Sequence, residues 1–243
     1  MKNSMKNHDP NRSYTTYAAE GSTARKWVDA VAYNKSPPEK YASEMHSLGQ
    51  ELANALLTQI DPKSHGDICV VCTAEDADYL ARGLVEILER RGLADRVRFL
   101  CMWNARREFD ELSVSPVLKQ YEEQFNHHKP IFVIIKSIIS GACVVKTNLT
   151  RMLSSATPSK IFVVSPVMLN DADKRLADEF PAKIASKFEF VTFAIDMTRK
   201  GSTVVPGIGG SVYERLGFEG EADKNRYYPS IVKERQERDH VPA

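Results

Sequence analysis

The chain has 243 residues, of which 42% are hydrophobic and 27% are charged, so it can bury a sizeable core as one large domain. Its 33 Lys and Arg residues nearly balance its 32 Asp and Glu residues, and the formal charge of +1 argues against attraction of the whole protein to nucleic acid or to an anionic membrane. Twelve glycines and twelve prolines exclude collagen-like and low-complexity classes, and no apolar run reaches the roughly 18 residues of a membrane span.

The cysteines and the first residues predict a cytoplasmic protein. Cys69, Cys72, Cys101 and Cys143 all sit in or beside apolar runs, as reduced cysteines of a core do. The first sixteen residues are polar and contain no apolar segment of the kind found in a secretory signal. A reducing compartment, the cytoplasm, is therefore expected.

Composition divides the chain into three segments. Residues 1–23 show no hydrophobic period and are predicted to be flexible. Residues 24–218 carry alternating helix and strand signals and are predicted to form the folded domain. Residues 219–243 form a charged tail, in which residues 227–229 (YYP) are the candidate anchor.

Helix and strand signals alternate along the folded segment. Amphipathic periods and stop signals predict helices over residues 24–33, 39–59, 77–91, 115–126, 144–153 and 171–179. Short apolar runs predict strands over residues 67–73, 96–103, 131–135, 160–166 and 188–196. Apolar strands that alternate with helices are typical of an α/β fold with a mostly parallel sheet and helices on both faces, here preceded by N-terminal helices.

Ligands of such folds bind beyond the carboxyl ends of the strands, so a site is expected in the loops that follow the strands. The loop after residue 135 contains Lys136, Ser137, Ser140, Gly141, Ala142 and Cys143, and a predicted helix follows it. Small residues between a strand and a helix can present backbone N–H groups to a phosphate, and the two hydroxyls could add hydrogen bonds. The alternative is a tight turn that binds no ligand.

A second candidate loop is rich in glycine. It comprises Val205, Pro206, Gly207, Ile208, Gly209 and Gly210. Such a loop exposes its backbone and suits recognition of a flat polar ligand through main-chain groups. A purely structural turn is the alternative.

The remaining candidates are charged. Thr73, Ala74, Glu75 and Asp76 lie at a predicted helix N-terminus, where acidic residues either cap the helix or contribute to a metal site. Arg106 and Arg107 follow the second strand and either contact a phosphate or remain solvated. Cys69 and Cys72 have the spacing of zinc ligands, but residues three apart on a strand point to opposite faces, and no second pair exists. No metal site is predicted.

Taken in order, these segments resemble the uracil phosphoribosyltransferase family over roughly residues 41–217. Residues 73–77 (TAEDA) stand where the family has an Ile-Leu-Arg-Ala-Gly loop, and residues 102–106 (MWNAR) stand where it has a strand ending in Tyr-Arg-Asp. Residues 136–143 (KSIISGAC) match its phosphoribosyl-pyrophosphate loop, Asp-Pro-Met-Leu-Ala-Thr-Gly-Gly. Residues 204–211 (VVPGIGGS) match its Ile-Val-Pro-Gly-Leu-Gly-Asp segment. The resemblance implies a type I phosphoribosyltransferase-like fold and a homodimer.

Several family positions have changed, two of them with reversed charge. Lys136 stands where the family has the acidic residue that holds ribose hydroxyls, and Glu75 stands where it has the arginine of the pyrophosphate loop. Asn104 and Gly210 replace an arginine and an aspartate. A contact between unit charges at ~4 Å is worth ~4 kcal/mol at an effective dielectric of ~20, so a reversed sign repels where it attracted. We expect Glu75 and Lys136 to face each other as a swapped pair, unless Glu75 caps its helix and Lys136 reaches a ligand phosphate.

The resemblance therefore implies a divergent phosphoribosyltransferase-like protein that binds a nucleobase, nucleotide or sugar phosphate. The first interpretation is an enzyme with changed chemistry. The alternatives are a non-catalytic nucleotide-binding or regulatory protein and an active uracil phosphoribosyltransferase that forms uridine monophosphate. Magnesium is expected only if phosphoribosyl pyrophosphate is bound. Residues 136–143 would hold phosphate and ribose, and residues 205–210 would hold the base.

Overall fold

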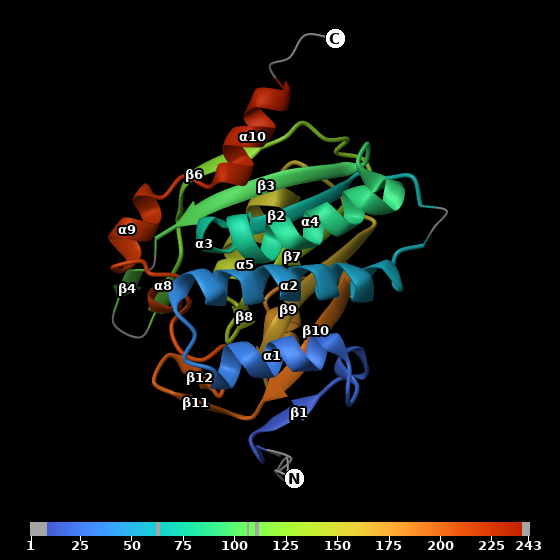
Figure 1. Ribbon diagram of the computed structural model, residues 1–243. Helices are drawn as coiled ribbons and strands as arrows, with labels where there is room; N and C mark the ends of the chain where they lie inside the picture. The colour runs from blue at the N-terminus through green and yellow to red at the C-terminus, as the bar shows by residue number, and fades with distance from the viewer. Residues whose placement is uncertain (1–8, 62–63, 106, 110–111, 240–243) are drawn as a thin grey trace.

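A computed structural model describes residues 9–61, 64–105, 107–109 and 112–239 (Figure 1). Its central sheet has the strand order β1-β10-β9-β7-β2-β3-β6. The five inner strands are parallel: β2 (Ile68–Thr73), β3 (Val97–Asn104), β7 (Ile131–Ile135), β9 (Lys160–Leu169) and β10 (Phe188–Asp196). A short strand, β8 (Ile138–Ile139), also pairs with β9 in parallel. The predicted α/β class with a mostly parallel sheet is confirmed.

Helices cover both faces of the sheet. One face carries α1 (Thr23–Tyr33), α2 (Pro38–Leu57) and a continuous helical stretch made of α3 (Ala74–Asp76), η2 (Ala77–Ala81), α4 (Arg82–Leu88) and η3 (Glu89–Leu93). The other face carries α5 (Cys143–Leu153) and α6 (Ala172–Asp178), with α7 (Ala182–Ala185) nearby in sequence. In Figure 1 α1, α2 and α4 lie in front of the sheet and α5 lies behind it.

The core lies in two layers because side chains alternate across each strand. On β2, Val70 and Cys72 join the apolar cluster beneath α1, α2 and α4, whereas Cys69 and Val71 join the cluster beneath α5 and α6. All four side chains are buried, as are the other residues of β2. A strand buried on both faces reads as one unbroken apolar run, which is why its sequence predicted it.

The predicted helix over residues 115–126 is wrong. Residues of this segment form β6 (Val117–Glu122), which pairs antiparallel with β3 at the edge of the sheet. Most of its side chains are exposed, so the segment has no buried apolar face that would have marked it as a strand. Pairing with the open edge of β3, rather than local propensity, decides its conformation.

The two terminal segments contain regular structure where the sequence predicted a flexible arm and a charged tail. Residues 9–22 contain β1 (Arg12–Tyr14), antiparallel to β10, and the single turn η1 (Thr16–Ala18). Residues 219–239 contain α9 (Glu221–Arg226) and α10 (Ser230–Asp239), which Figure 1 shows beside β3 and β6. The predicted anchor is confirmed, because Tyr228 stacks on Trp103 and the Trp103 indole N–H donates to the Tyr227 carbonyl at 2.8 Å.

The remaining elements are short. Two antiparallel pairs are formed by β4 (Arg107–Phe109) with β5 (Leu112–Val114) and by β11 (Thr198–Lys200) with β12 (Thr203–Val205), and α8 (Val212–Arg215) precedes α9. Across the part of the chain that the structure describes, we find no helix with the length and apolarity needed to cross a membrane.

Candidate functional site

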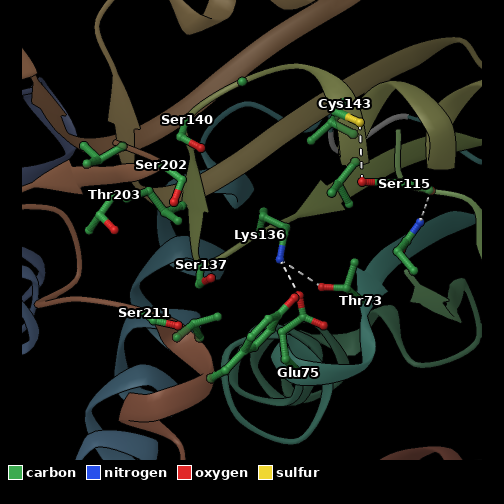
Figure 2. Close-up of a pocket in the computed structure, with 18 of the residues that line it drawn as sticks. Thr73, Glu75, Ser115, Lys136, Ser137, Ser140, Cys143, Ser202, Thr203 and Ser211 are labelled. Atoms are coloured by element: carbon green, nitrogen blue, oxygen red, sulfur yellow. Dashed lines mark hydrogen bonds and ion pairs between the residues drawn. The ribbon is translucent and has the colours of Figure 1, made fainter. Parts of the chain in front are cut away.

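The candidate site lies where the chain order of the sheet reverses. From β2 the chain continues outward to β3, whereas β7, β9 and β10 build the sheet in the other direction. The connections after β2 and β7 therefore diverge, and this arrangement leaves a crevice at the carboxyl ends of the strands. A pocket of about 210 Å³ occupies the crevice (Figure 2). It is lined by Thr73, Glu75, Asn104, Ser115, Lys136, Ser137, Ile138, Ser140, Gly141, Cys143, Val144, Val145, Ser202, Thr203, Val204, Gly210, Ser211, Val212, Tyr213 and Lys224.

Lys136 and Glu75 form the predicted swapped pair. The Lys136 Nζ atom lies 2.7 Å from Glu75 Oε1 and 2.9 Å from Asp76 Oδ2. It also donates to the Thr73 hydroxyl at 3.0 Å. Figure 2 shows Lys136 and Glu75 pointing toward each other, with Thr73 beside them. The expected contact between the loops after β2 and β7 is confirmed, and Asp76 is an additional member that the sequence analysis did not place in it.

Burial and charge act against each other in this cluster. Burial alone would raise the pKa of Glu75, but the Lys136 and Lys224 ammonium groups outweigh it and hold that pKa at about 2. Burial raises the pKa of Asp76 despite the attraction of Lys136. Burial would lower the pKa of Lys136, but the two carboxylates more than offset this and raise it above its ordinary value. The lysine is therefore held in its charged form between two acids.

Lys136 has no hydrogen-bonding capacity left for a ligand. A lysine ammonium has three N–H donors, and Thr73, Glu75 and Asp76 take all three. A phosphate could bind Lys136 only by displacing one of these partners. Lys136 therefore lines the pocket, but its ammonium group is engaged with the protein and is not open toward a phosphate or ribose.

The loop after β7 supplies much of the pocket wall. Ser137, Ser140, Gly141 and Cys143 line the pocket. The Ser137 backbone N–H donates to Asp76 Oδ2 at 3.3 Å, and the Cys143 thiol donates to the Ser115 hydroxyl at 3.4 Å. Ala142, from the same predicted set, does not line the pocket and instead packs against the core layer beneath α5.

The predicted base-binding loop is mostly turned away from the pocket. Gly210 lines the pocket, but Val205, Pro206, Gly207, Ile208 and Gly209 do not. The Gly207 N–H donates to the buried carboxylate of Asp196 at 2.7 Å, and the Ile208 carbonyl accepts from the Tyr41 hydroxyl at 3.2 Å. These backbone groups therefore make hydrogen bonds within the protein.

Arg12 completes this internal arrangement. Its guanidinium donates to both oxygens of Asp196, at 2.7 and 2.8 Å, and to the Gly207 carbonyl at 2.6 Å. Arg12 and Asp196 are both buried. The bidentate pair ties β1 and the glycine-rich loop to the end of β10.

Lys224 is the pocket residue that sequence reasoning missed most clearly. It lies on α9, in the segment predicted to be a charged tail, yet only 1% of its surface is exposed. Its Nζ atom donates to the Asn104 carbonyl and lies 5.6 Å from the centre of the Tyr213 ring. The hydroxyl residues Ser115, Ser202, Thr203 and Ser211 were also missed. No local signal marks any of them, because they come from several short segments: the connection between β5 and β6, the β11–β12 hairpin, the residue before α8, and α9.

Other predicted residues lie beside or beyond the pocket. Ala74 and Asp76 are buried next to it, and neither lines it directly. Arg106 lies outside the described residues, and Arg107 begins β4, with its side chain not described. Within the described ranges, no group of three or more His, Cys, Asp or Glu side chains could hold a metal ion.

Comparisons with known proteins support the fold and leave the activity open. No family model and no curated protein matches the chain. Among solved structures, the AQ2163 protein from Aquifex aeolicus is similar, with 17% identity and a TM-score of 0.62 over 81% of this chain and 95% of that chain. At this identity the likeness shows the fold alone.

Two further solved structures are similar at a lower level. A hypoxanthine phosphoribosyltransferase from Staphylococcus aureus is 15% identical, with a TM-score of 0.37 over 60% of this chain and 71% of that chain. A hypothetical protein from Neisseria gonorrhoeae with bound ppGpp is 12% identical, with a TM-score of 0.38 over 61% and 80% of the two chains. These scores are too low to support a functional comparison.

Proposed function

We propose that this is a divergent phosphoribosyltransferase-like protein whose pocket at the carboxyl ends of β2 and β7 binds a nucleobase, nucleotide or sugar phosphate, and that it does not carry out ordinary uracil phosphoribosyl transfer. The observation that carries the proposal is the cluster of Lys136, Glu75 and Asp76 in the crevice where the chain order reverses. The position is one where α/β folds bind ligands. The charges there are reversed relative to the family that the sequence resembles.

The cluster does not fit a complex of magnesium with phosphoribosyl pyrophosphate. Glu75 presents a carboxylate where a pyrophosphate would need a cation, and repulsion replaces attraction. A magnesium ion placed on Glu75 and Asp76 would have to displace the ammonium group that already lies within 3 Å of both carboxylates. The residues present therefore do not fit magnesium-dependent phosphoribosyl transfer.

The same cluster favours binding without catalysis over the interpretation as an enzyme with changed chemistry. All three donors of Lys136 are satisfied by the protein, so this residue has no free N–H to offer a reacting group. A catalytic role for Lys136 would require the ligand to open the cluster.

The homodimer and the cytoplasmic location remain predictions from the sequence.

The test combines an activity assay with analysis of retained ligand. The full chain should form no uridine monophosphate from uracil and phosphoribosyl pyrophosphate with magnesium present, and native mass spectrometry should detect a nucleotide or sugar phosphate on the purified protein. A kcat/KM of ~10⁴ M⁻¹s⁻¹ or more, which is within the ordinary range of enzymes, would overturn the proposal. Failure of every nucleobase, nucleotide and sugar phosphate to bind at millimolar concentration would also overturn it.

A further inference from the structure

Lys224 differs from Lys136 in what it can offer a ligand. Its ammonium group donates one hydrogen bond, to the neutral carbonyl of Asn104, and among the described residues it makes no ion pair. Two of its three N–H donors therefore remain available. Lys224 lines the same pocket as Lys136 and is almost fully buried. Its one hydrogen-bonding partner carries no charge, and burial lowers the pKa of Lys224 although the carboxylates of Glu75, Glu221 and Asp76 attract it from a distance. An anion that accepts directly from the ammonium group would offset this cost of burial.

Three polar atoms of the same pocket lack partners. Within the described part of the chain, Glu75 Oε2, Asn104 Oδ1 and Ser137 Oγ make no hydrogen bond. Their residues are 3%, 5% and 0% exposed, and all three line the pocket. Burial of a polar atom without a hydrogen-bonding partner is destabilising. Two of the three atoms are pure acceptors, so a ligand that relieves this cost must bring hydrogen-bond donors to Glu75 and Asn104.

Hydroxyl groups fit these acceptors better than amines do. Glu75 already faces the charge of Lys136 at 2.7 Å, and Lys224 contributes to the low pKa of its carboxyl group. A cationic amine placed on Glu75 Oε2 would meet two lysines of the same sign, whereas a neutral hydroxyl would not. The side of the pocket away from Glu75 presents hydroxyls from Ser140, Ser202, Thr203 and Ser211, which can both donate and accept (Figure 2).

We propose that the pocket binds a polyhydroxylated molecule of monosaccharide size with one anionic group, whose hydroxyls donate to Glu75 Oε2 and Asn104 Oδ1 and whose anionic group accepts from Lys224. Lys224 is then the residue that selects the charged ligand, and α9 is part of the binding site. The inference rests on the proposed function, because it concerns the same pocket, and it assigns the anion to Lys224 rather than to Lys136.

Calorimetry on the full chain tests the assignment with ribose 5-phosphate, ribose and inorganic phosphate as probes. The parent protein should bind ribose 5-phosphate at least about tenfold more tightly than either fragment, which corresponds to about 1.4 kcal/mol. The Lys224→Met variant, in which an apolar chain of similar length replaces the amine, should lose about tenfold in affinity for ribose 5-phosphate and keep its affinity for ribose. Lys233→Met, at an exposed lysine of α10, is the matched control and should bind as the parent does.

A second variant and a measurement on the parent protein distinguish loss of the Lys224 charge from misfolding of the Lys224→Met variant. Lys224→Gln keeps a donor for the Asn104 carbonyl but removes the charge, and it should lose affinity as Lys224→Met does. In the parent protein, ribose 5-phosphate should slow acetylation of Lys224 by acetic anhydride while leaving that of Lys233 unchanged. This readout requires no substitution.

Each outcome separates the inference from the function on which it rests. If both Lys224 variants bind ribose 5-phosphate as the parent does, Lys224 does not hold the anion and the inference is wrong. Equal affinity for inorganic phosphate and ribose 5-phosphate would show that the hydroxyls of the ligand contribute nothing to binding, and the inference would be wrong. Binding of uracil or uridine monophosphate without binding of ribose 5-phosphate would overturn the inference and leave the proposed function standing. If none of these molecules binds, both fail.

Discussion

At the scale of single residues, the pocket depends on one lysine that holds two buried carboxylates. Glu75 and Asp76 are 3% and 1% exposed, so neither can turn to solvent if Lys136 is lost. Removal of one partner from a buried ion pair is strongly destabilising, because the other charge stays buried without compensation. The cluster therefore matters for stability mainly because its disruption would leave buried charges without a partner.

Replacement of Lys136 by methionine tests this dependence. Lys136→Met should lower the free energy of unfolding by about 3–5 kcal/mol, since it strands two carboxylates. The control is Lys146→Met, which removes an exposed lysine from its pair with Glu179 and should cost about 0–1 kcal/mol. Urea denaturation of both variants measures the difference. Equal losses in the two variants would contradict the importance of the buried cluster.

The low pKa of Glu75 predicts a defined dependence of stability on pH. The pKa is about 2 in the folded protein against an ordinary value of 4.5, so the charged form is favoured by folding. The stabilisation that the charged Glu75 carboxylate gives is fully present above its ordinary pKa. It is lost as the pH falls toward the pKa of the folded protein. The difference in unfolding free energy between the parent and Glu75→Gln should therefore narrow between about pH 5 and pH 2. A difference that stays constant over this range would show that Glu75 is not held in its charged form.

At the scale of elements, the glycine-rich loop serves the packing of the fold more directly than the pocket. A Cβ atom at Gly209 would lie 2.3 Å from the Val31 carbonyl oxygen of α1, and the residue has a φ of +80°. Both features exclude a larger residue, because the contact is with backbone and the conformation is left-handed. A valine at this position would therefore disturb the fold itself, so Gly209→Val cannot separate an effect on ligand binding from one on stability.

Two glycines of the site region should respond differently to the same substitution. Gly209→Ala should lower the free energy of unfolding by about 1–3 kcal/mol, because α1 must move away. Gly141→Ala should change it by less than about 0.5 kcal/mol, because an added Cβ there meets no atom within 4 Å. Gly141 lines the pocket, so its variant isolates an effect on ligand binding from one on stability. Denaturation curves of both variants measure their free energies of unfolding. A large loss in Gly141→Ala would contradict the predicted difference between the two glycines.

At the scale of the whole molecule, the C-terminal segment joins regions that are far apart in sequence. Asp78 of η2 accepts hydrogen bonds from the backbone N–H groups of Ser230 and Ile231, both at 2.7 Å, and from the Tyr227 hydroxyl. It thereby caps α10 from a different element. Arg235 of α10 pairs with the buried carboxylate of Glu123 at 2.9 Å. These contacts hold α9, and with it Lys224, against the pocket.

Loss of the cap at Asp78 should loosen this segment before the rest of the molecule. Asp78→Ala is expected to cost about 1–2 kcal/mol, the usual cost of removing a cap. Amide hydrogen exchange should accelerate over residues 221–239 and remain unchanged in the inner strands of the sheet. Asp178→Ala, at an exposed position on α6, is the control. Uniform acceleration throughout the chain would show that the segment does not open as a separate unit.

The sequence by itself determined the inner sheet, most of its helices and the centre of the site. Strands buried on both faces appear as apolar runs, and amphipathic helices appear as periodic ones, so both are encoded by near neighbours in the chain. Glu75 and Lys136 each follow a strand directly, and parallel strands bring their carboxyl ends to one edge of the sheet. Their contact could therefore be predicted from sequence order together with the resemblance of the two loops.

Only the tertiary structure decided the outer parts of the fold and the rest of the site. The strand β6, the pairing of Arg12 with Asp196 and the burial of Lys224 depend on partners more than about ten residues away, which no local pattern encodes. A charged residue in a polar stretch reads as solvated until the element that covers it is known. Lys224 lies 120 positions from Asn104, and only docking of α9 onto the pocket turns that tail residue into a buried cation.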